Sequence, residues 1–428
     1  PDLPALAVDA MGHVHALWSE SELPDNTEQV LQYARWDGEN WSRPGSVLLS
    51  PAGTSEQPAV VAQGDFLLVL WSGGASRQIW HSRAFLQDTY AAAGWSEPQS
   101  LPIPDSATGA GGATWPHVVA SQGVLHAVYA VPVNENRGIY YVRSEDNGTS
   151  WQLAGQVFDA AEAGWTAADT PRLAVDARGS VHVVWVHNSL SPGKPPQGVY
   201  YAVSEDDGET WSEPLEVVEG AYAWPQVGAS GTGQVHLVWN EAVGGSAWHR
   251  WAPSSSTAPA ELGYGWTRAE RVPGLSDVRG PMGLASDGAG RLHLVGLGLD
   301  DSGEPALLYT VWSDAAELAA GDGRWAKREV FRLGLDPSEP GIGIALQPTL
   351  GRLDIIIGGQ ALEGEETVLK GLWYTGRAVS PAGAPLPTVV PTRPTETPLP
   401  TPTPEPLATA TPDLAGGPPP LGSDSTGL

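Results

Sequence analysis

The sequence contains no cysteine, so neither disulfide bonds nor thiolate chemistry is possible. Phenylalanine and methionine are scarce, at 4 and 2 residues against 19 tryptophans. No apolar run reaches roughly 18 residues, so no helix that spans a bilayer is predicted. Basic residues number 22 against 49 acidic ones, which gives a formal net charge of −27. This charge repels phosphate backbones and anionic membrane surfaces, and nucleic-acid binding is therefore not expected.

The chain consists largely of a repeated unit. In six copies the opening strand is predicted to follow a proline, at Pro4, Pro58, Pro116, Pro171, Pro225 and Pro281, and the intervals are 54, 58, 55, 54 and 56 residues. The copy at 171–214 is the clearest. Its first two apolar runs are joined by Asp176-Ala177-Arg178-Gly179, which indicates a hairpin because glycine accepts a positive φ. A weaker seventh copy occupies 341–359.

A tryptophan precedes the fourth strand in six copies, and the seventh copy has none. These residues are Trp41, Trp95, Trp151, Trp211, Trp266 and Trp325. Two of them end full matches to Ser-x-Asp-x-Gly-x-x-Trp, formed by Ser144, Asp146, Gly148 and Trp151 and by Ser204, Asp206, Gly208 and Trp211. In such a turn the carboxylate can accept backbone N–H bonds and glycine permits a left-handed residue. We therefore predict a structural role for these eight residues.

The two turns match the Asp-box, and over residues 1–378 the chain resembles the sialidase-like superfamily of BNR/Asp-box repeat proteins. The resemblance implies an all-β fold, a β-propeller of four-stranded antiparallel blades, with Asp-box turns on the face opposite the ligand site. Four short strands per repeat indicate the same architecture. Seven sets of first to third strands predict seven blades, the last with only three strands. The alternative is six blades, the number found in sialidases.

Residues 379–428 are rich in proline and threonine and poor in large apolar residues. Such a composition cannot form a core and predicts a disordered C-terminal tail, either a semi-rigid stalk or a linker. The stretch resembles the spacers that precede surface anchors in bacterial envelope proteins. We therefore expect an extracellular or cell-surface protein of a prokaryote, with a possible anchor beyond the C-terminus. Because the chain starts at Pro1, we interpret it as a fragment or a mature form.

In a propeller, one face carries the loops that enter the first strands and leave the second strands. The candidate ligand-binding residues on this face are Trp115, His117, Arg172, His187, Trp224, Gln226 and Arg279. If the protein were a glycoside hydrolase, its carboxylates would come from Glu20, Asp169 and Glu241. Two carboxylates separated by roughly 5–10 Å would indicate hydrolysis, whereas an aromatic-lined, partly polar depression would indicate binding.

Sialidases grip the carboxylate of their substrate with three arginines, the first in an Arg-Ile-Pro segment that this sequence lacks. Arg172 and Arg279 are the only arginines that suit such a clamp. The histidines at 15, 126, 182, 236 and 293 occupy one repeat position in different blades, so they cannot converge on one metal. We predict that each bonds within its own blade, that no metal or cofactor is required, and that Trp18, Trp71, Trp185 and Trp239 pack within the blades.

The sequence therefore favours a surface-displayed or secreted propeller that acts as a recognition module for glycans or another extracellular partner, as a monomer. One alternative is a glycoside hydrolase, a sialidase or another, with its active site at the channel mouth. A second is a structural or assembly propeller without a ligand. The missing arginine segment weighs against an enzyme without excluding one.

Overall fold

The computed structural model describes residues 2–21, 29–51, 53–74, 77–104, 112–191, 193–230, 233–256, 265–287, 291–313, 324–332, 344–349, 352–363 and 366–378. They belong to one compact unit, Pro1–Arg393. The unit is built from β-sheets, with two short 3-10 turns at Ala92–Gly94 and Ser254–Ser256. Within these ranges no helix has the length and apolar character needed to cross a membrane. The predicted stalk, 379–428, lies outside the described residues.

Six sheets contain four strands each, ordered as in the chain. The first three sheets comprise β1 (Asp2–Val8), β2 (Val14–Ser21), β3 (Gln29–Trp36) and β4 (Gly45–Leu48); β5 (Ser55–Gln63), β6 (Phe66–Gly73), β7 (Gln78–Phe85) and β8 (Gln99–Ser100); and β9 (Thr114–Ser121), β10 (Val124–Val131), β11 (Gly138–Ser144) and β12 (Gln152–Asp159). The next three comprise β13 (Ala167–Val175), β14 (Val181–Asn188), β15 (Gly198–Ser204) and β16 (Leu215–Glu219); β17 (Tyr222–Ala229), β18 (Gln234–Glu241), β19 (Ala247–Pro253) and β20 (Glu270–Arg271); and β21 (Arg279–Ser286), β22 (Leu292–Leu299), β23 (Pro305–Trp312) and β24 (Glu329–Arg332). We number these sheets as blades 1 to 6.

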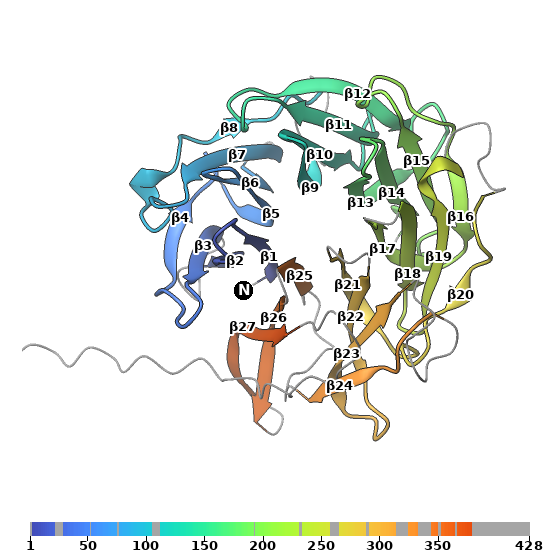
Figure 1. Ribbon diagram of the computed structural model, residues 1–428. Helices are drawn as coiled ribbons and strands as arrows, with labels where there is room; N and C mark the ends of the chain where they lie inside the picture. Colours follow the sequence, from blue (N-terminus) through green and yellow to red (C-terminus); the bar gives the residue numbers. More distant parts are fainter. Residues whose placement is uncertain are drawn as a thin grey trace, which may run out of the picture. The chain divides into compact units, whose positions relative to one another are not determined.

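The blades stand side by side around a central channel, with the first strand of each blade innermost (Figure 1). Each innermost strand contacts the next one, from β1 to β21. A further sheet of three strands, β25 (Ile344–Thr349), β26 (Arg352–Glu363) and β27 (Glu366–Ala378), completes the ring, because β25 contacts both β21 and β1. At this junction Ile356 and Leu372 pack against Leu6 and Trp18 of blade 1.

The propeller thus has six four-stranded blades, in agreement with the six-blade alternative. The main prediction of seven blades is not matched, because the segment predicted as the seventh blade forms the three-stranded sheet β25–β27. The sheet β25–β27 has three strands in the described part of the chain, as the absence of a seventh tryptophan predicts. In other blades this tryptophan fastens the outer segment to the third strand. Trp41 bridges to Trp36, Trp95 to Ala84, and Trp325 to Trp312.

The innermost strands begin before their prolines, whereas the sequence predicted that they begin after them. β5 starts at Ser55 and contains Pro58, and its pairing with β6 shifts register between Glu56 and Ala59. An innermost strand pairs on one side only, because its other edge faces the channel. A proline without an N–H therefore breaks no ladder bond there, and the extra residue forms a bulge.

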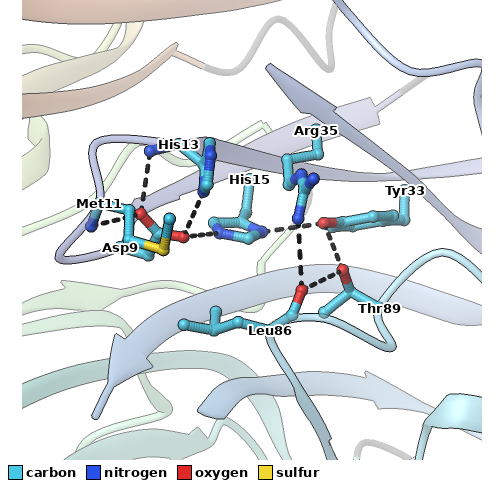
Figure 2. Close-up of polar contacts among 8 residues, drawn as sticks. All are labelled: Asp9, Met11, His13, His15, Tyr33, Arg35, Leu86 and Thr89. Atoms are coloured by element: carbon cyan, nitrogen blue, oxygen red, sulfur yellow. Dashed lines mark hydrogen bonds and ion pairs between the residues drawn. The ribbon is translucent and has the colours of Figure 1, made fainter. Parts of the chain in front are cut away.

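Polar side chains close the hairpin end of blade 1 (Figure 2). Asp9 Oδ1 accepts the backbone N–H groups of Met11 and His13, both at 2.9 Å, and Asp9 Oδ2 lies 3.3 Å from Nε2 of the buried His15. Nδ1 of His15 lies 2.9 Å from the hydroxyl of Tyr33. The predicted structural role of this histidine position is confirmed in blade 1, since both ring nitrogens bond within the blade. The predicted packing of Trp18, Trp71, Trp185 and Trp239 is also confirmed, because at most 5% of each is exposed.

The turn from Ser204 to Trp211 is held by its own side chains. Asp206 Oδ1 accepts the N–H of Thr210 at 2.9 Å and the hydroxyl of Ser204 at 2.8 Å. Gly208 has φ +88°, and a Cβ there would lie 2.2 Å from the ring of Tyr141 in the neighbouring blade. The turn from Ser144 to Trp151 has the same bonds around Asp146. In both turns the carboxylate accepts bonds from within the turn and the glycine has a positive φ.

Candidate functional site

A cavity of about 430 Å³ lies in the channel, lined by the innermost strands of the six four-stranded blades. Most of its lining is small or aliphatic. The larger polar side chains that line it are Gln57, His117, Arg172 and Gln226, on β5, β9, β13 and β17. Three of these four were predicted as ligand-binding residues, and Gln57 was not.

Five residues at one end of the cavity have a left-handed backbone, and each immediately precedes a proline. They are Gln57 (φ 53°), Trp115 (φ 55°), Thr170 (φ 48°), Trp224 (φ 52°) and Gly280 (φ 69°). A residue before proline normally adopts an extended conformation, and a positive φ is costly for a side chain as large as tryptophan. Strained backbone of this kind is concentrated at functional sites. The repeated X-Pro bulge therefore marks this end, which we call the channel mouth.

The channel mouth is at the opposite end of the strands from the turns described above. In blade 3, Thr114 pairs with Ala130, whereas Leu125 at the other end of β10 pairs with Ser144, where the turn begins. A ligand at the mouth would thus lie far from Ser144–Trp151.

Two tryptophans of the mouth touch each other although their blades are not adjacent. The rings of Trp115, in blade 3, and Trp224, in blade 5, meet edge to face with centroids 6.0 Å apart. The guanidinium carbon of Arg172, in blade 4, lies 6.0 Å from the centroid of the Trp115 ring. The three side chains thus form one cluster, which brings together three of the predicted ligand-binding residues.

Arg172 of this cluster and His117 of the cavity lining carry hydrogen-bond donors. Arg172 donates from Nη1 to the backbone oxygen of Pro171 at 2.8 Å, and no carboxylate of the described residues lies within ion-pair distance of it. Burial lowers the pKa of Arg172 to about 10, so it stays charged at neutral pH. His117 accepts the N–H of Leu173 on Nδ1 at 3.3 Å, which places its ring proton on Nε2. Burial lowers the pKa of His117 to about 3, and its imidazole is therefore neutral.

Asp169 is a carboxylate whose charge interacts with that of Arg172. Its Oδ1 accepts the backbone N–H of Thr170 at 2.8 Å and so holds one of the left-handed residues. Burial raises its pKa to about 6, although the bonds from Thr170 and Asn188 and the charge of Arg172 act in the opposite direction. The protonation of Asp169 therefore changes near neutral pH.

The other predicted residues lie outside the cavity lining. His187 stacks on Trp165 with centroids 3.9 Å apart, and Arg279 is exposed and packs against the backbone of Gly244. Glu20 accepts the indole N–H of Trp18 at 2.9 Å. Glu241 accepts that of Trp248 at 3.4 Å. Within the described ranges, no group of three His, Cys, Asp or Glu residues could hold a metal ion.

Gln57, Thr170 and Gly280 escaped the sequence analysis, although a signal for them exists. All three stand immediately before the repeat proline, in the same position as Trp115 and Trp224. In five of the six repeats, the residue before this proline belongs to the mouth.

No family model matches the chain. None of the curated proteins matches it either. Among solved structures, a protein of unknown function from Dyadobacter fermentans DSM 18053 is similar, with TM-score 0.53 and 16% identity over 89% of this chain and 94% of that one. This similarity shows the fold. An alpha-L-arabinanase from Penicillium chrysogenum has TM-score 0.46 and 13% identity over 72% of this chain and 92% of that one. A Hadza microbial sialidase has TM-score 0.41 and 15% identity over 83% and 62%.

Proposed function

We propose that this protein is a recognition module that binds glycans at the channel mouth. The observation that carries the proposal is the contact between Trp115 and Trp224 beside Arg172. Indole faces offer apolar area to the C–H face of a sugar ring, and a few placed polar groups then fix its orientation. A cavity of about 430 Å³ has room for a small saccharide.

The polar groups of the mouth suit a ligand that is rich in acceptor oxygens. Arg172 uses one N–H on a backbone oxygen, which leaves the rest of its planar fork to donate to a ligand. His117 offers a second donor, Nε2–H. Sugar hydroxyl, ring and carbonyl oxygens accept such bonds. Since the net charge of −27 repels anions over long range, we favour uncharged saccharides.

Glycoside hydrolysis is the second candidate, and Asp169 is the reason to keep it. A carboxyl group with a pKa of about 6 could serve as a general acid near neutral pH. Hydrolysis needs a second carboxylate across the ligand, however, and Glu20 and Glu241 are each bonded to a tryptophan outside the cavity lining. Binding therefore accounts better for the described residues.

We further propose that residues 1–378 form a propeller of the BNR/Asp-box type and that residues 379–428 form a stalk that displays it outside a prokaryotic cell. The Pro/Thr-rich composition of the tail supports the stalk. Deletion of residues 380–428 is expected to leave the melting temperature of the propeller unchanged. A lower melting temperature would contradict the stalk, and failure of antibodies to label intact cells would contradict surface display.

A glycan array tests the binding function, with the purified protein and the variants Trp115→Ala, Trp224→Ala and Arg172→Met. We expect hits among uncharged sugars, and a loss of affinity of about tenfold or more in each variant. Leu153→Ala, at an exposed position on the outer strand β12, is the control and should bind like the wild type. An array without hits, or variants that bind as well as the wild type, would refute the proposal.

A further inference from the structure

We propose that Gln57 is a positioning residue: its carboxamide holds Trp115 in place at the channel mouth and so sets the affinity of the mouth for its ligand. The proposal rests on the function proposed above for that site. It adds a residue that lies in another blade, 58 positions before the tryptophan. Gln57 acts on the ligand through Trp115.

The backbone of Trp115 needs an external support. Its φ of 55° places a bulky residue before Pro116 in a conformation that costs on the order of 1–3 kcal/mol. Such a conformation persists only when the surroundings hold it. The N–H of Trp115 donates to Oε1 of Gln57 at 2.8 Å, and this bond links the left-handed residue to a side chain of the neighbouring blade.

Similar side-chain bonds hold two other residues of the mouth. Asp169 accepts the N–H of Thr170, and Asn240 donates from Nδ2 to the backbone oxygen of Gly280 at 3.2 Å. These residues differ in type and come from different strands. Fixing the left-handed residue by a side chain is therefore a recurrent feature of the mouth, and Gln57 does so for a tryptophan of the binding cluster.

Gln57 is itself well anchored. Its Oε1 also accepts the hydroxyl of Ser72 on β6 at 2.9 Å, and Ser72 is 4% exposed. One carboxamide oxygen thus joins the second strand of blade 2 to the first strand of blade 3. Because Ser72 holds Oε1 of Gln57 within blade 2, this oxygen can hold the N–H of Trp115 in blade 3.

Loss of this anchor should displace the indole. In a bulge, the extra residue sets the side of the sheet to which the neighbouring side chains point. If Trp115 became extended, the bulge would be lost and the indole would point elsewhere. The ring would then leave both Trp224, at 6.0 Å, and Arg172. The contact between the two indoles therefore reports directly on the anchor.

Circular dichroism of the full chain tests the anchor without a ligand, because two indoles in contact give an exciton couplet in the far ultraviolet. The couplet of this pair is the part of the spectrum that is lost both in Trp115→Phe and in Trp224→Phe. Gln57→Leu should abolish it, and Gln57→Glu, which keeps an acceptor oxygen, should restore it. The matched control is Gln63→Leu, because Gln63 lies on the same strand and also bonds to blade 3, to the oxygen of Gly123, but at the far end.

Affinity is then measured for a saccharide identified on the array. Gln57→Leu should weaken binding about tenfold, whereas Gln63→Leu should not change it. A couplet that survives in Gln57→Leu would show that Gln57 does not position Trp115. Loss of the couplet with unchanged affinity would show that the position of Trp115 does not set the affinity for the saccharide. If the wild type binds no saccharide, the proposed function fails, but the couplet still decides whether Gln57 positions Trp115.

Discussion

Nδ1 of His126 lies 2.6 Å from the hydroxyl of Tyr141, and this bond joins the second and third strands of blade 3 in its interior. The tyrosine pairs with Val128, two residues along β10 from the histidine. The same relation recurs in blades 1, 4 and 6, in the pairs His15–Tyr33, His182–Tyr201 and His293–Tyr309. In blade 5 the partner is a histidine, His249.

Replacement of this histidine should therefore destabilise the blade. His126→Leu leaves the buried hydroxyl of Tyr141 without the acceptor or donor that it now has, at a cost of about 1–3 kcal/mol in the free energy of unfolding. The double variant His126→Leu/Tyr141→Phe should recover part of this loss, because both polar groups are then gone. Urea denaturation measures all three free energies. Equal stability of the single variant and the wild type would contradict the structural role.

The same histidine should make the fold sensitive to acid. Burial lowers the pKa of His126 to about 4, below the ordinary value of 6.5. Between these pH values the unfolded chain binds a proton that the folded chain does not, so stability falls as the pH drops from 6.5 to 4, by up to about 1.4 kcal/mol per pH unit. In His126→Leu the free energy of unfolding should fall less steeply over this window. Unchanged steepness would show that His126 titrates normally.

Asp169 should change the pH dependence of stability in the opposite direction to His126. Burial raises its pKa to about 6, above the ordinary 3.8, so the folded chain binds the proton more tightly than the unfolded chain. Its contribution to stability is therefore complete below pH 4 and is lost as the pH rises through 6. Asp169→Asn keeps an oxygen that can accept the N–H of Thr170 but cannot titrate. Relative to the wild type, this variant should gain stability between pH 4 and pH 7, and a constant difference would refute the raised pKa.

The repeat period and the six repeated tryptophans were sufficient to predict four-stranded blades, because they reflect how each unit packs on the next, but the main count of seven blades was not matched. The bulge of the innermost strands was not predictable in this way. A residue before proline prefers an extended backbone, and only tertiary contacts such as Gln57 to Trp115 impose the left-handed one. Position in the repeat pointed to Trp115, His117, Arg172, Trp224 and Gln226, which line the cavity or belong to its mouth. It also pointed to His187 and Arg279, which lie outside the cavity lining, because the ends of the strands do not reveal which way a side chain points.

Asp206→Ala should lower the free energy of unfolding by about 1–2 kcal/mol, since it removes the acceptor of the Thr210 N–H and of two hydroxyls. The turn lies at the end of the blade away from the channel mouth, so affinity for a saccharide should not change. Glu209→Ala, an exposed residue of the same turn, is the control and should be neutral. Weaker binding by a stably folded Asp206→Ala would show that the two faces have been assigned the wrong way round.

The purified protein should not release sialic acid from a fluorogenic sialoside. A substrate carboxylate needs several guanidinium forks for tight, oriented binding, and lysine lacks the planar fork. Arg172 is the one arginine among the described residues of the cavity lining, and the exposed Arg279 packs against Gly244 instead. The net charge of −27 adds long-range repulsion against an anionic substrate. Turnover that disappears in Arg172→Ala would contradict this prediction, and would mean that Arg172 holds the substrate carboxylate without the other guanidinium groups that this argument requires.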